Sequence, residues 1–466
     1  MKHYTLLYII CAAALITGCG TYSKYHHPDM ADLSTLSDLS DLSDMSDTSD
    51  WSDQSATPDT LLSWRMLFTD RPLQSLIDSA LTGNADLRIA SLRVAEAEAS
   101  LKAARLAYLP SLSFSPQGSL SSYDGSNAAK TYNLALSAEW EIEFAGRLTA
   151  AKRGAKASAE MYHDARQAVR TQLIATVANS YYNLLALDAQ LEIIRRTLDS
   201  WQETVRTMQA RKEVGEANDA AVTQAKANML AVKNDMVKIS QQISQQENAV
   251  CLLLGTTPRH IPRTTLDCQS LPDKLCTGIP LQLLAHRPDV RQAEHALQLA
   301  YYNTNVARAA FYPQVSLSGT LGWANSDGSA IVNPAKWLTN AIGSLVQPIF
   351  SKGRNQANLR IAKAQQEEAL IAFRQQLLKA GSEVNDALTA WQHANERLEI
   401  CRSQKEMLRQ TVSSTSLIMS HSEDASYLEV LTAQQSLLQA ELAEKQELFG
   451  KIQAIISLYH AIGGGE

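Results

Sequence analysis

Four cysteines in the body of the chain are the first candidates for chemistry: Cys251, Cys268, Cys276 and Cys401. None belongs to a Cys-x-x-Cys pair, so the spacing argues against a zinc site. Cys268 and Cys276 lie close in sequence and can form a disulfide in an oxidising compartment; the alternative is two independent small apolar side chains. The chain has no nucleophile–base pair, phosphate-binding loop or cofactor motif. We therefore predict that it is not an enzyme and has no catalytic residue, metal site or dissociable cofactor.

Cys19 is a candidate for covalent modification. The apolar run from Tyr4 to Thr17 is too short to cross a bilayer as a helix. It ends in Ile16-Thr17-Gly18-Cys19, and small residues directly before a cysteine resemble the lipobox of bacterial lipoproteins. We predict that residues 1–18 are a signal peptide and that Cys19 carries a covalent lipid. The alternative is an ordinary signal peptide with an incidental cysteine. Gly20, where an aspartate would retain the protein in the inner membrane, favours the outer membrane.

Residues 19–60 predict a solvated, disordered tether between the lipid and the folded body. A Leu/Met-Ser-Asp triplet recurs across residues 39–47, and such a polar, charged stretch cannot bury enough apolar surface to fold. The regular aspartates do not form a calcium loop, because the glycine and terminal glutamate of an EF-hand are missing. The formal net charge of the whole chain is −6, which argues against nucleic acid as a partner.

The remainder of the chain repeats itself. Asp86-Leu87-Arg88 begins an Ala-rich helical segment that reaches Pro110, and Asp289-Val290-Arg291 begins one that reaches Pro313 over the same distance. Later, Phe144-Ala145-Gly146-Arg147 corresponds to Phe350-Ser351-Lys352-Gly353-Arg354. These landmarks indicate a duplicated unit of about 200 residues. We divide the chain into a first repeat (61–255), a connector (256–288) and a second repeat (289–466).

Each repeat predicts a long helical hairpin, over 147–254 in the first repeat and 354–462 in the second. The proline at 110 or 313 ends the preceding helix. Within the long helices of each hairpin, apolar residues follow a three-four spacing typical of left-handed coiled coils. On one helix these are Leu184, Leu187, Leu191, Ile194, Leu198, Trp201, Val205 and Met208. A helix over 147–213 would be about 100 Å long, which exceeds any globular core.

Two pairs of strands separate the helices. The pattern places strands at about 111–123 and 131–143, and again at about 314–324 and 337–349. Leu112, Phe114 and Leu120 alternate with serines, and later strands alternate in the same way. Strands of this length can cross the hydrocarbon layer when tilted, with lipid on one face and water on the other. The alternative is a soluble sheet with one buried face.

Four strands are too few to close a membrane barrel, and an open sheet leaves unpaired edges in lipid. Copies of the chain must therefore share one barrel. Two copies would give eight strands and three would give twelve, and strand count alone does not choose between them. The predicted fold class is mixed and mostly α, with long coiled-coil helices continuing the barrel.

Several motifs together resemble the outer-membrane efflux factor family, in its lipoprotein branch that partners resistance-nodulation-division pumps. They are Arg287-Pro288-Asp289-Val290, Gln347-Pro348-Ile349-Phe350, Tyr427-Leu428-Glu429-Val430-Leu431 and the closing Leu458–Gly465. The resemblance runs from about Trp64 to the end of the chain. It implies a homotrimer with a helical tunnel (an α-barrel) and a twelve-stranded barrel. It also implies docking onto a periplasmic adaptor and an inner-membrane pump, with the protein anchored in outer-membrane lipid and extending into the periplasm.

The same resemblance identifies functional positions. The turns between the long helices are expected to form the periplasmic aperture and the adaptor-binding tip, which involves Gly215, Glu216, Asp219, Glu423, Asp424 and Glu429. Three copies of Glu429 would form a ring of like charges that can select cations. Glu423 stands where the family often has a turn glycine, so the register of that turn is open by about one residue. Arg287, Pro288 and Asp289 we interpret as a helix start, because proline and aspartate suit the first turn.

We predict a passive duct that carries small molecules, such as drugs and toxic compounds, out of the cell. Two alternatives remain: the exit duct of a type I protein-secretion system, and a structural coiled-coil envelope lipoprotein. The signal and Pro348-Ile349-Phe350 favour efflux over secretion, and the amphipathic strands argue against a purely structural role.

Overall fold

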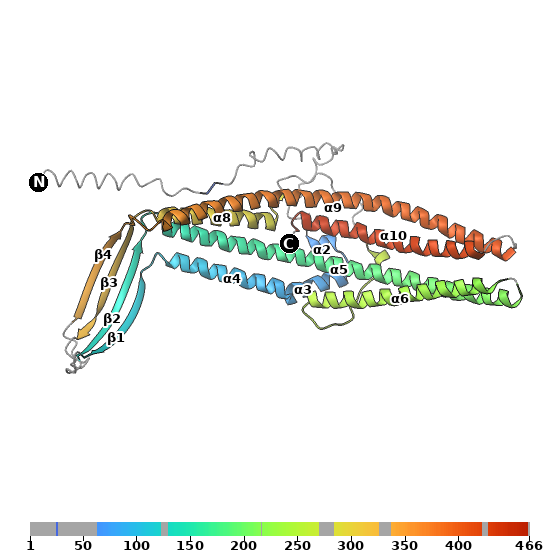
Figure 1. Cartoon of the computed structure of the whole chain (residues 1–466), viewed down its shortest axis with the longest axis horizontal. Helices are drawn as coiled ribbons and strands as arrows, with labels where there is room; N and C mark the ends of the chain where they lie inside the picture. The colour runs from blue at the N-terminus through green and yellow to red at the C-terminus, as the bar shows by residue number, and fades with distance from the viewer. Residues whose placement is uncertain are drawn as a thin grey trace. The chain divides into compact units, whose positions relative to one another are not determined.

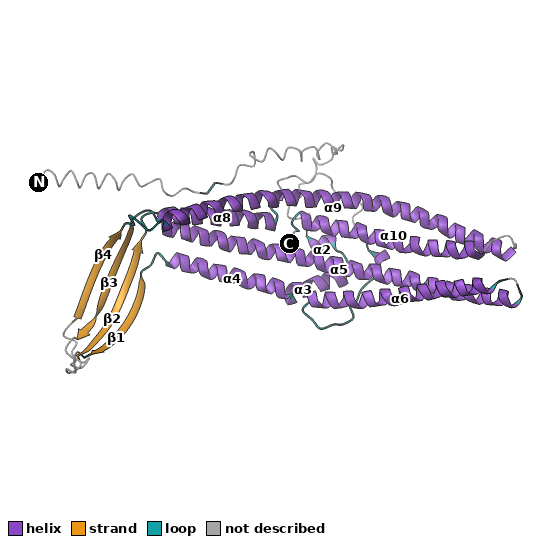
Figure 2. Ribbon diagram, viewed as in Figure 1, coloured by secondary structure: helices purple, strands orange, loops and turns teal. Residues whose placement is uncertain are grey.

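The computed structural model describes residues 25–26, 63–122, 129–215, 217–269, 284–325, 337–421 and 427–464. These residues are mostly helical, with a single sheet of four strands (Figures 1 and 2). The first repeat contains α2 (Trp64–Leu67), α3 (Arg71–Gly83), α4 (Ala85–Leu106), β1 (Ser111–Ser121), β2 (Ala129–Ile142), α5 (Arg147–Glu213) and α6 (Asp219–Leu253). A short 3-10 helix, η3 (Leu266–Cys268), precedes the second repeat. That repeat contains α8 (Pro288–Ala309), β3 (Gln314–Asn325), β4 (Trp337–Val346), α9 (Arg354–His421) and α10 (Tyr427–Ala461).

Element lengths bear out the internal duplication. Helices α4 and α8 each contain 22 residues, and α6 and α10 each contain 35. Helix α5 contains 67 residues and α9 contains 68. The order of helix, two strands and two helices is the same in both repeats. The fold class predicted from the sequence is confirmed.

The chain forms two compact units that do not follow the two repeats. The first includes Ser91–Asp164 and Arg291–Gln376, and the second includes Leu36–Ala90, Ala165–Val290 and Leu377–Glu466. Each unit therefore takes corresponding segments from both repeats. The reason is that α5 and α9 are too long for one core, so each contributes to both units.

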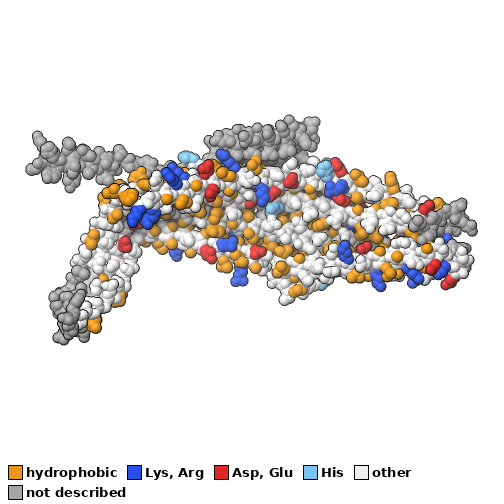
Figure 3. All heavy atoms as spheres, viewed as in Figure 1, with side chains coloured by type: hydrophobic (Ala, Val, Ile, Leu, Met, Phe, Trp, Pro, Cys, Tyr) orange, Lys and Arg blue, Asp and Glu red, His pale blue; other side chains and the backbone are white. Residues whose placement is uncertain are grey.

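The sheet of the first unit is antiparallel in the order β1-β2-β3-β4. The register pairs Phe114 with Leu136, and Leu136 in turn with Leu321. Since side chains alternate across a strand, this register gathers the apolar residues of β1, β2 and β3 on one face. The other face carries mostly serine, threonine, asparagine and glutamate. Figure 3 shows few charged side chains over the strands on the face in view, whereas the helices carry many.

The fourth strand is shorter than the sequence pattern predicts. It ends at Val346, before Pro348, whereas the predicted strand extends to residue 349. Proline has no backbone N–H to donate to a ladder, so a strand end at this point is expected. Ile342 and Val346 also lie on the polar face, and both are exposed. This strand is therefore the least regular of the four.

The second unit is held by a continuous apolar core. Its members come from α2, α3, α5, α6 and α10 and include Trp64, Phe68, Leu73, Ile77, Tyr181, Tyr182, Leu184, Val250, Ile452, Ile456 and Tyr459. Gly255 permits the close approach of α3 and the end of α6, because it adopts a φ of +67° and a Cβ there would lie 2.5 Å from the carbonyl oxygen of Gly83. The short helices α2 and α3 thus close one side of the core.

The coiled-coil spacing predicted for α5 is confirmed by burial. Of the eight apolar positions, seven are buried and Leu198 packs at the edge of the core. Near the hairpin end, Val205 and Met208 of α5 contact Val222 and Ala225 of α6. The burial of each such side chain stabilises the folded hairpin by about 1.5–3 kcal/mol, and this contribution repeats along its length.

Candidate functional site

The turn between α5 and α6 ends one of the two long hairpins. Gly215 has a φ of +81°, a conformation that only glycine adopts without strain, and it lets the chain leave α5. The Asn218 side chain then caps α6 by accepting a hydrogen bond from a backbone N–H in its first turn, at 2.8 Å. Lys212 Nζ lies 2.5 Å from Asp219 Oδ1 across the turn. This hydrogen bond and the charge of Lys212 lower the pKa of the Asp219 carboxyl below its ordinary value. Glu216 lies outside the described residues.

The turn between α9 and α10 can be described only in part. Glu423 and Asp424 lie outside the described residues. Glu429 stands in the first turn of α10 and its side chain is exposed, whereas the next two residues, Val430 and Leu431, are buried. A carboxylate in the first turn is favourable because it faces the positive end of the helix dipole. The geometry therefore leaves the Glu429 charge in solvent at the end of the second hairpin.

A row of glutamates on α10 binds the basic residues of α9. Glu447 accepts from Arg397 at 2.7 Å, Glu444 from Lys405 at 2.5 Å, and Glu441 from Arg409 at 2.9 Å. Glu441 also pairs with Arg196 of α5 at 2.7 Å and is itself buried, with 6% of its surface exposed.

Glu441 is the most deeply buried of these three glutamates. Its two arginines compensate the charge that burial would otherwise penalise. The row fixes the pairing of the two helices of the second hairpin.

Arg287 lies at the start of α8 and is almost fully buried, with 1% of its surface exposed. Its guanidinium binds Asp289 Oδ2 at 2.7 Å and Glu383 Oε2 at 2.6 Å, and it donates to the carbonyl oxygen of Ala461 at 2.6 Å. Burial alone would lower the pKa of Arg287, but the hydrogen bonds that it donates to Asp289 and Glu383 outweigh burial and raise that pKa. Pro288 occupies the first position of α8.

Arg287 thus joins the start of α8 to α9 and to the end of α10. It has a wider role than the helix start that the sequence indicates.

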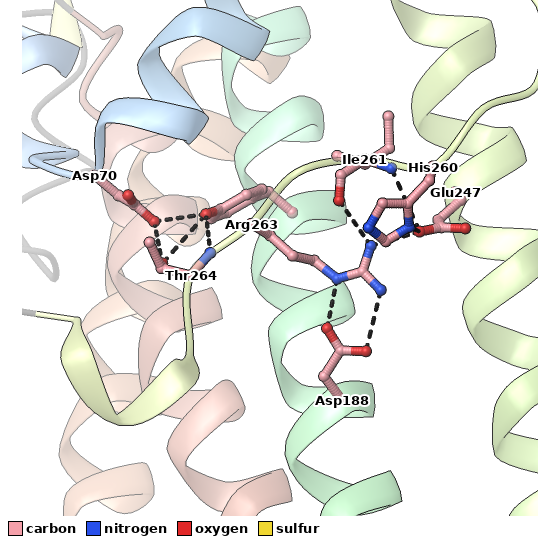
Figure 4. A network of polar contacts seen from close by, with 8 residues as sticks. Asp70, Asp188, Glu247, His260, Ile261, Arg263 and Thr264 are labelled. Atoms are coloured by element: carbon pink, nitrogen blue, oxygen red, sulfur yellow. Dashed lines mark hydrogen bonds and ion pairs between the residues drawn. The ribbon is translucent and has the colours of Figure 1, made fainter.

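The connector carries a polar network that the sequence pattern does not reveal (Figure 4). Arg263 binds Asp188 of α5 and Glu247 of α6, the latter at 2.5 Å, and His260 contacts the same Glu247 at 2.8 Å. Each of these residues sits in ordinary polar sequence, so only their spatial arrangement distinguishes them. The network ties the connector to both helices of the first hairpin.

A second part of the same network begins at the residue before α3. Asp70 accepts hydrogen bonds from the hydroxyls of Tyr181 at 2.6 Å and Thr264 at 2.7 Å (Figure 4). Burial and the hydrogen bond with Asp70 raise the pKa of Tyr181 to about 12. The phenol therefore stays protonated and donates to Asp70 at neutral pH.

The remaining candidate residues are placed as follows. Pro110 and Pro313 lie just beyond the ends of α4 and α8. The Cys268 thiol is free and accepts a hydrogen bond from Thr265 at 3.1 Å. Cys276 and Cys19 lie outside the described residues, so the disulfide and the lipid anchor stay predictions.

Across the described ranges, His, Cys, Asp and Glu side chains form no group of three or more that could hold a metal ion. Nor does any described helix combine the length and apolar character that a membrane crossing would require. The arrangement in these ranges offers ion pairs, helix caps and an amphipathic sheet.

Comparison with known proteins agrees with this architecture. The family model described as outer membrane efflux protein matches residues 76–256 and 279–464. The cation efflux system protein CusC of Escherichia coli strain K12 is 32% identical over 458 residues, which cover 98% of this chain and 98% of that protein. The probable outer membrane lipoprotein SilC of Salmonella typhimurium is 29% identical over 412 residues, which cover 86% and 88%.

A crystal structure of CusC superimposes with a TM-score of 0.82 at 31% identity, over 95% of this chain and 99% of that one. The family model covers most of the chain in two segments that correspond to the two repeats. The chain therefore belongs to the outer membrane efflux protein family.

Proposed function

We propose that three copies of the chain close into one passive duct that crosses the outer membrane and the periplasm. The observation that carries this proposal is the sheet: it has an apolar face, a polar face and two outer strands, each with one neighbouring strand among the described residues. In a bilayer each edge needs a strand from another copy. Three copies give twelve strands, which is enough for an open pore, whereas eight strands leave an interior filled by side chains.

The duct would receive its cargo from an inner-membrane pump through a periplasmic adaptor. The similarity to CusC supports this arrangement and favours cations or other small solutes as the cargo. The similarity to SilC, which is named a lipoprotein, supports the anchor at Cys19. A type I secretion duct has the same architecture, but CusC is named for cation efflux, so efflux is favoured.

Planar-bilayer recording and complementation together test the proposal. The purified full-length protein should have the native mass of three copies in detergent and should form open pores in a bilayer. Expressed with its pump and adaptor in a strain that lacks its own exit duct, it should restore growth in transition-metal salts, organic solvents or antibiotics. The class of compounds to which resistance is restored identifies the cargo. Purification as a single copy without conductance would contradict the proposed duct.

Replacing Glu429 with alanine should raise the single-channel conductance if this residue helps to keep the resting aperture closed. Three like charges at one constriction attract cations and respond to salt, so the ion selectivity should also shift toward anions. Glu406→Ala is the matched control, because Glu406 is an exposed glutamate on α9. Equal conductance for Glu429→Ala and the unmodified protein would show that Glu429 does not help to close the aperture.

Replacing Cys19 with serine should abolish lipidation, because serine cannot form the thioether. Mass spectrometry of the mature N-terminus should then show the loss of the acyl groups, and processing of residues 1–18 should fail or slow. Cys401→Ser is the control, since this thiol lies within α9. If the mature N-termini of the unmodified protein and of Cys19→Ser differ only by the exchange of sulfur for oxygen, and neither carries acyl groups, the signal peptide is of the ordinary kind.

A further inference from the structure

The outer edges of β1 and β4 have no partner strand among the described residues, although both strands are well formed. β1 pairs only with β2, and β4 pairs only with β3. The side chains near these edges are unusually exposed: Leu112 is 71% exposed, Leu345 67% and Ile349 96%. In the closed ring of the proposed function, β4 of one copy must meet β1 of the next.

We propose that β4 pairs with β1 of a neighbouring copy in one defined register, in which Val346 lies opposite Ser115 of the neighbour. This inference rests on the proposed function, because it assumes that copies of the chain share a barrel. It goes beyond that function in assigning which residues meet at the seam.

The internal duplication supplies the register. Ala85 and Leu106 bound α4 as Pro288 and Ala309 bound α8, so each residue up to the end of β1 corresponds to the residue 203 positions later. Arg147 begins α5 as Arg354 begins α9, so residues of β2 correspond to residues 207 positions later, in β4.

Two independent features of the structure support these correspondences. Ser111 pairs with Glu139 in the first hairpin, and the corresponding residues Gln314 and Val346 pair in the second. The hydrogen bonds at the ends of α4 and α8 correspond in the same way.

Trp140 Nε1 donates to the carbonyl oxygen of Tyr108 at 2.9 Å, and Gln347 Nε2 donates to that of Phe311 at 3.0 Å. Gln347 follows Trp140 by 207 positions and Phe311 follows Tyr108 by 203. The donor and the acceptor of this hydrogen bond are therefore displaced by the same two offsets that relate the repeats.

The seam between β2 and β3 is the template for the seam between copies. Ile142 pairs with Val315 within the chain, and the corresponding residues are Ile349 and Leu112. By the same rule Glu139 and Ser318, which pair within the chain, correspond to Val346 and Ser115.

This register places Ile349 and Leu112 together on the apolar face, and it sets Val346 and Ile342 of β4 opposite serines of β1 on the polar face. A slip by one residue would set Ile349 against a serine, on the wrong face, and such slips are strongly disfavoured where one face is apolar.

Disulfide cross-linking of the full-length protein in cells tests the register. The variant carries Val346→Cys and Ser115→Cys, which would lie directly opposite each other across the seam. Opposed residues of an antiparallel pair have Cα atoms about 4.5–5.5 Å apart, which a disulfide can bridge. Two intervening strands separate these positions within one chain, so any bond between them joins two copies.

Two matched controls differ from this variant by a slip of two residues on the same face. They combine Val346→Cys with Ser113→Cys or with Gln117→Cys. Residues displaced by two lie about 7–8 Å apart, beyond easy reach of a disulfide. A second opposed pair, Ile342→Cys with Ser119→Cys, repeats the measurement further along the seam.

The expected result is a reducible covalent trimer on denaturing gels, at least about tenfold more abundant for the opposed pairs than for the controls. Stronger linkage of either control pair would overturn the register while leaving the shared barrel intact. So would a native trimer in which neither opposed pair cross-links. A native monomer without cross-links in any variant would instead overturn the proposed function.

Discussion

Replacing Arg287 with methionine should lower the free energy of unfolding by about 3 kcal/mol. The substitution keeps most of the side-chain volume but removes the charge that Asp289 and Glu383 share. It also leaves the carbonyl oxygen of Ala461 without its 2.6 Å hydrogen bond. The expected loss is at the low end for a buried ion pair, because both carboxylates are about 30% exposed and remain partly solvated. The melting temperature of the protein in detergent, followed by circular dichroism, measures the effect.

Two further variants separate this effect from the general cost of losing an arginine. Arg206 is 74% exposed and pairs only loosely with Glu203, at 3.5 Å, so Arg206→Met should change stability by less than about 0.5 kcal/mol. Adding Glu383→Gln to Arg287→Met removes one of the two carboxylates that bind Arg287 and should recover part of the lost stability. Equal melting temperatures for Arg287→Met and Arg206→Met would show that the buried network contributes nothing to stability.

The architecture could be predicted from the sequence because it rests on periodic patterns. The three-four spacing along α5 and the alternation along β1 repeat many times, so single exceptions do not obscure them. Duplication added a second, independent copy of each pattern. The prediction was less accurate at the end of β4, where the strand ends at Val346, before Pro348.

The polar networks could not be predicted in the same way. Arg263 and Asp188 are 75 positions apart, and nothing in their local sequence indicates that they meet. Glu441 lies in sequence that resembles that of Glu444 and Glu447, yet it alone pairs with Arg196 from a distant helix. Arg287 was recognised as part of a motif, but its contacts with α9 and α10 depend on tertiary packing. Contacts of this kind have no sequence period, so only the folded chain reveals them.

Replacing Gly322 with alanine should disrupt the junction between the two hairpins of the sheet. A Cβ at Gly322 would lie 2.1 Å from the carbonyl oxygen of Leu134 and 2.9 Å from the Cα of Ala135 on β2. No flexible side chain can move aside, so the two backbones must separate. Overpacking costs about 1–3 kcal/mol in ordinary cores, and a backbone clash belongs at the upper end of that range. The measurement is the amount of folded trimer in unheated outer-membrane extracts, which should fall sharply.

Gly343→Ala is the matched control, because Gly343 lies in the same sheet and a Cβ there meets nothing within 4 Å. Its trimer should be as abundant as that of the unmodified protein. The comparison tests the link between the two repeats. β2 and β3 form the only seam at which the two hairpins pair within the described residues, so failure there opens the sheet between the repeats. If Gly322→Ala assembles as well as Gly343→Ala, β2 and β3 are less closely packed than the structure shows. The seam would then be a weaker template for the contact between copies.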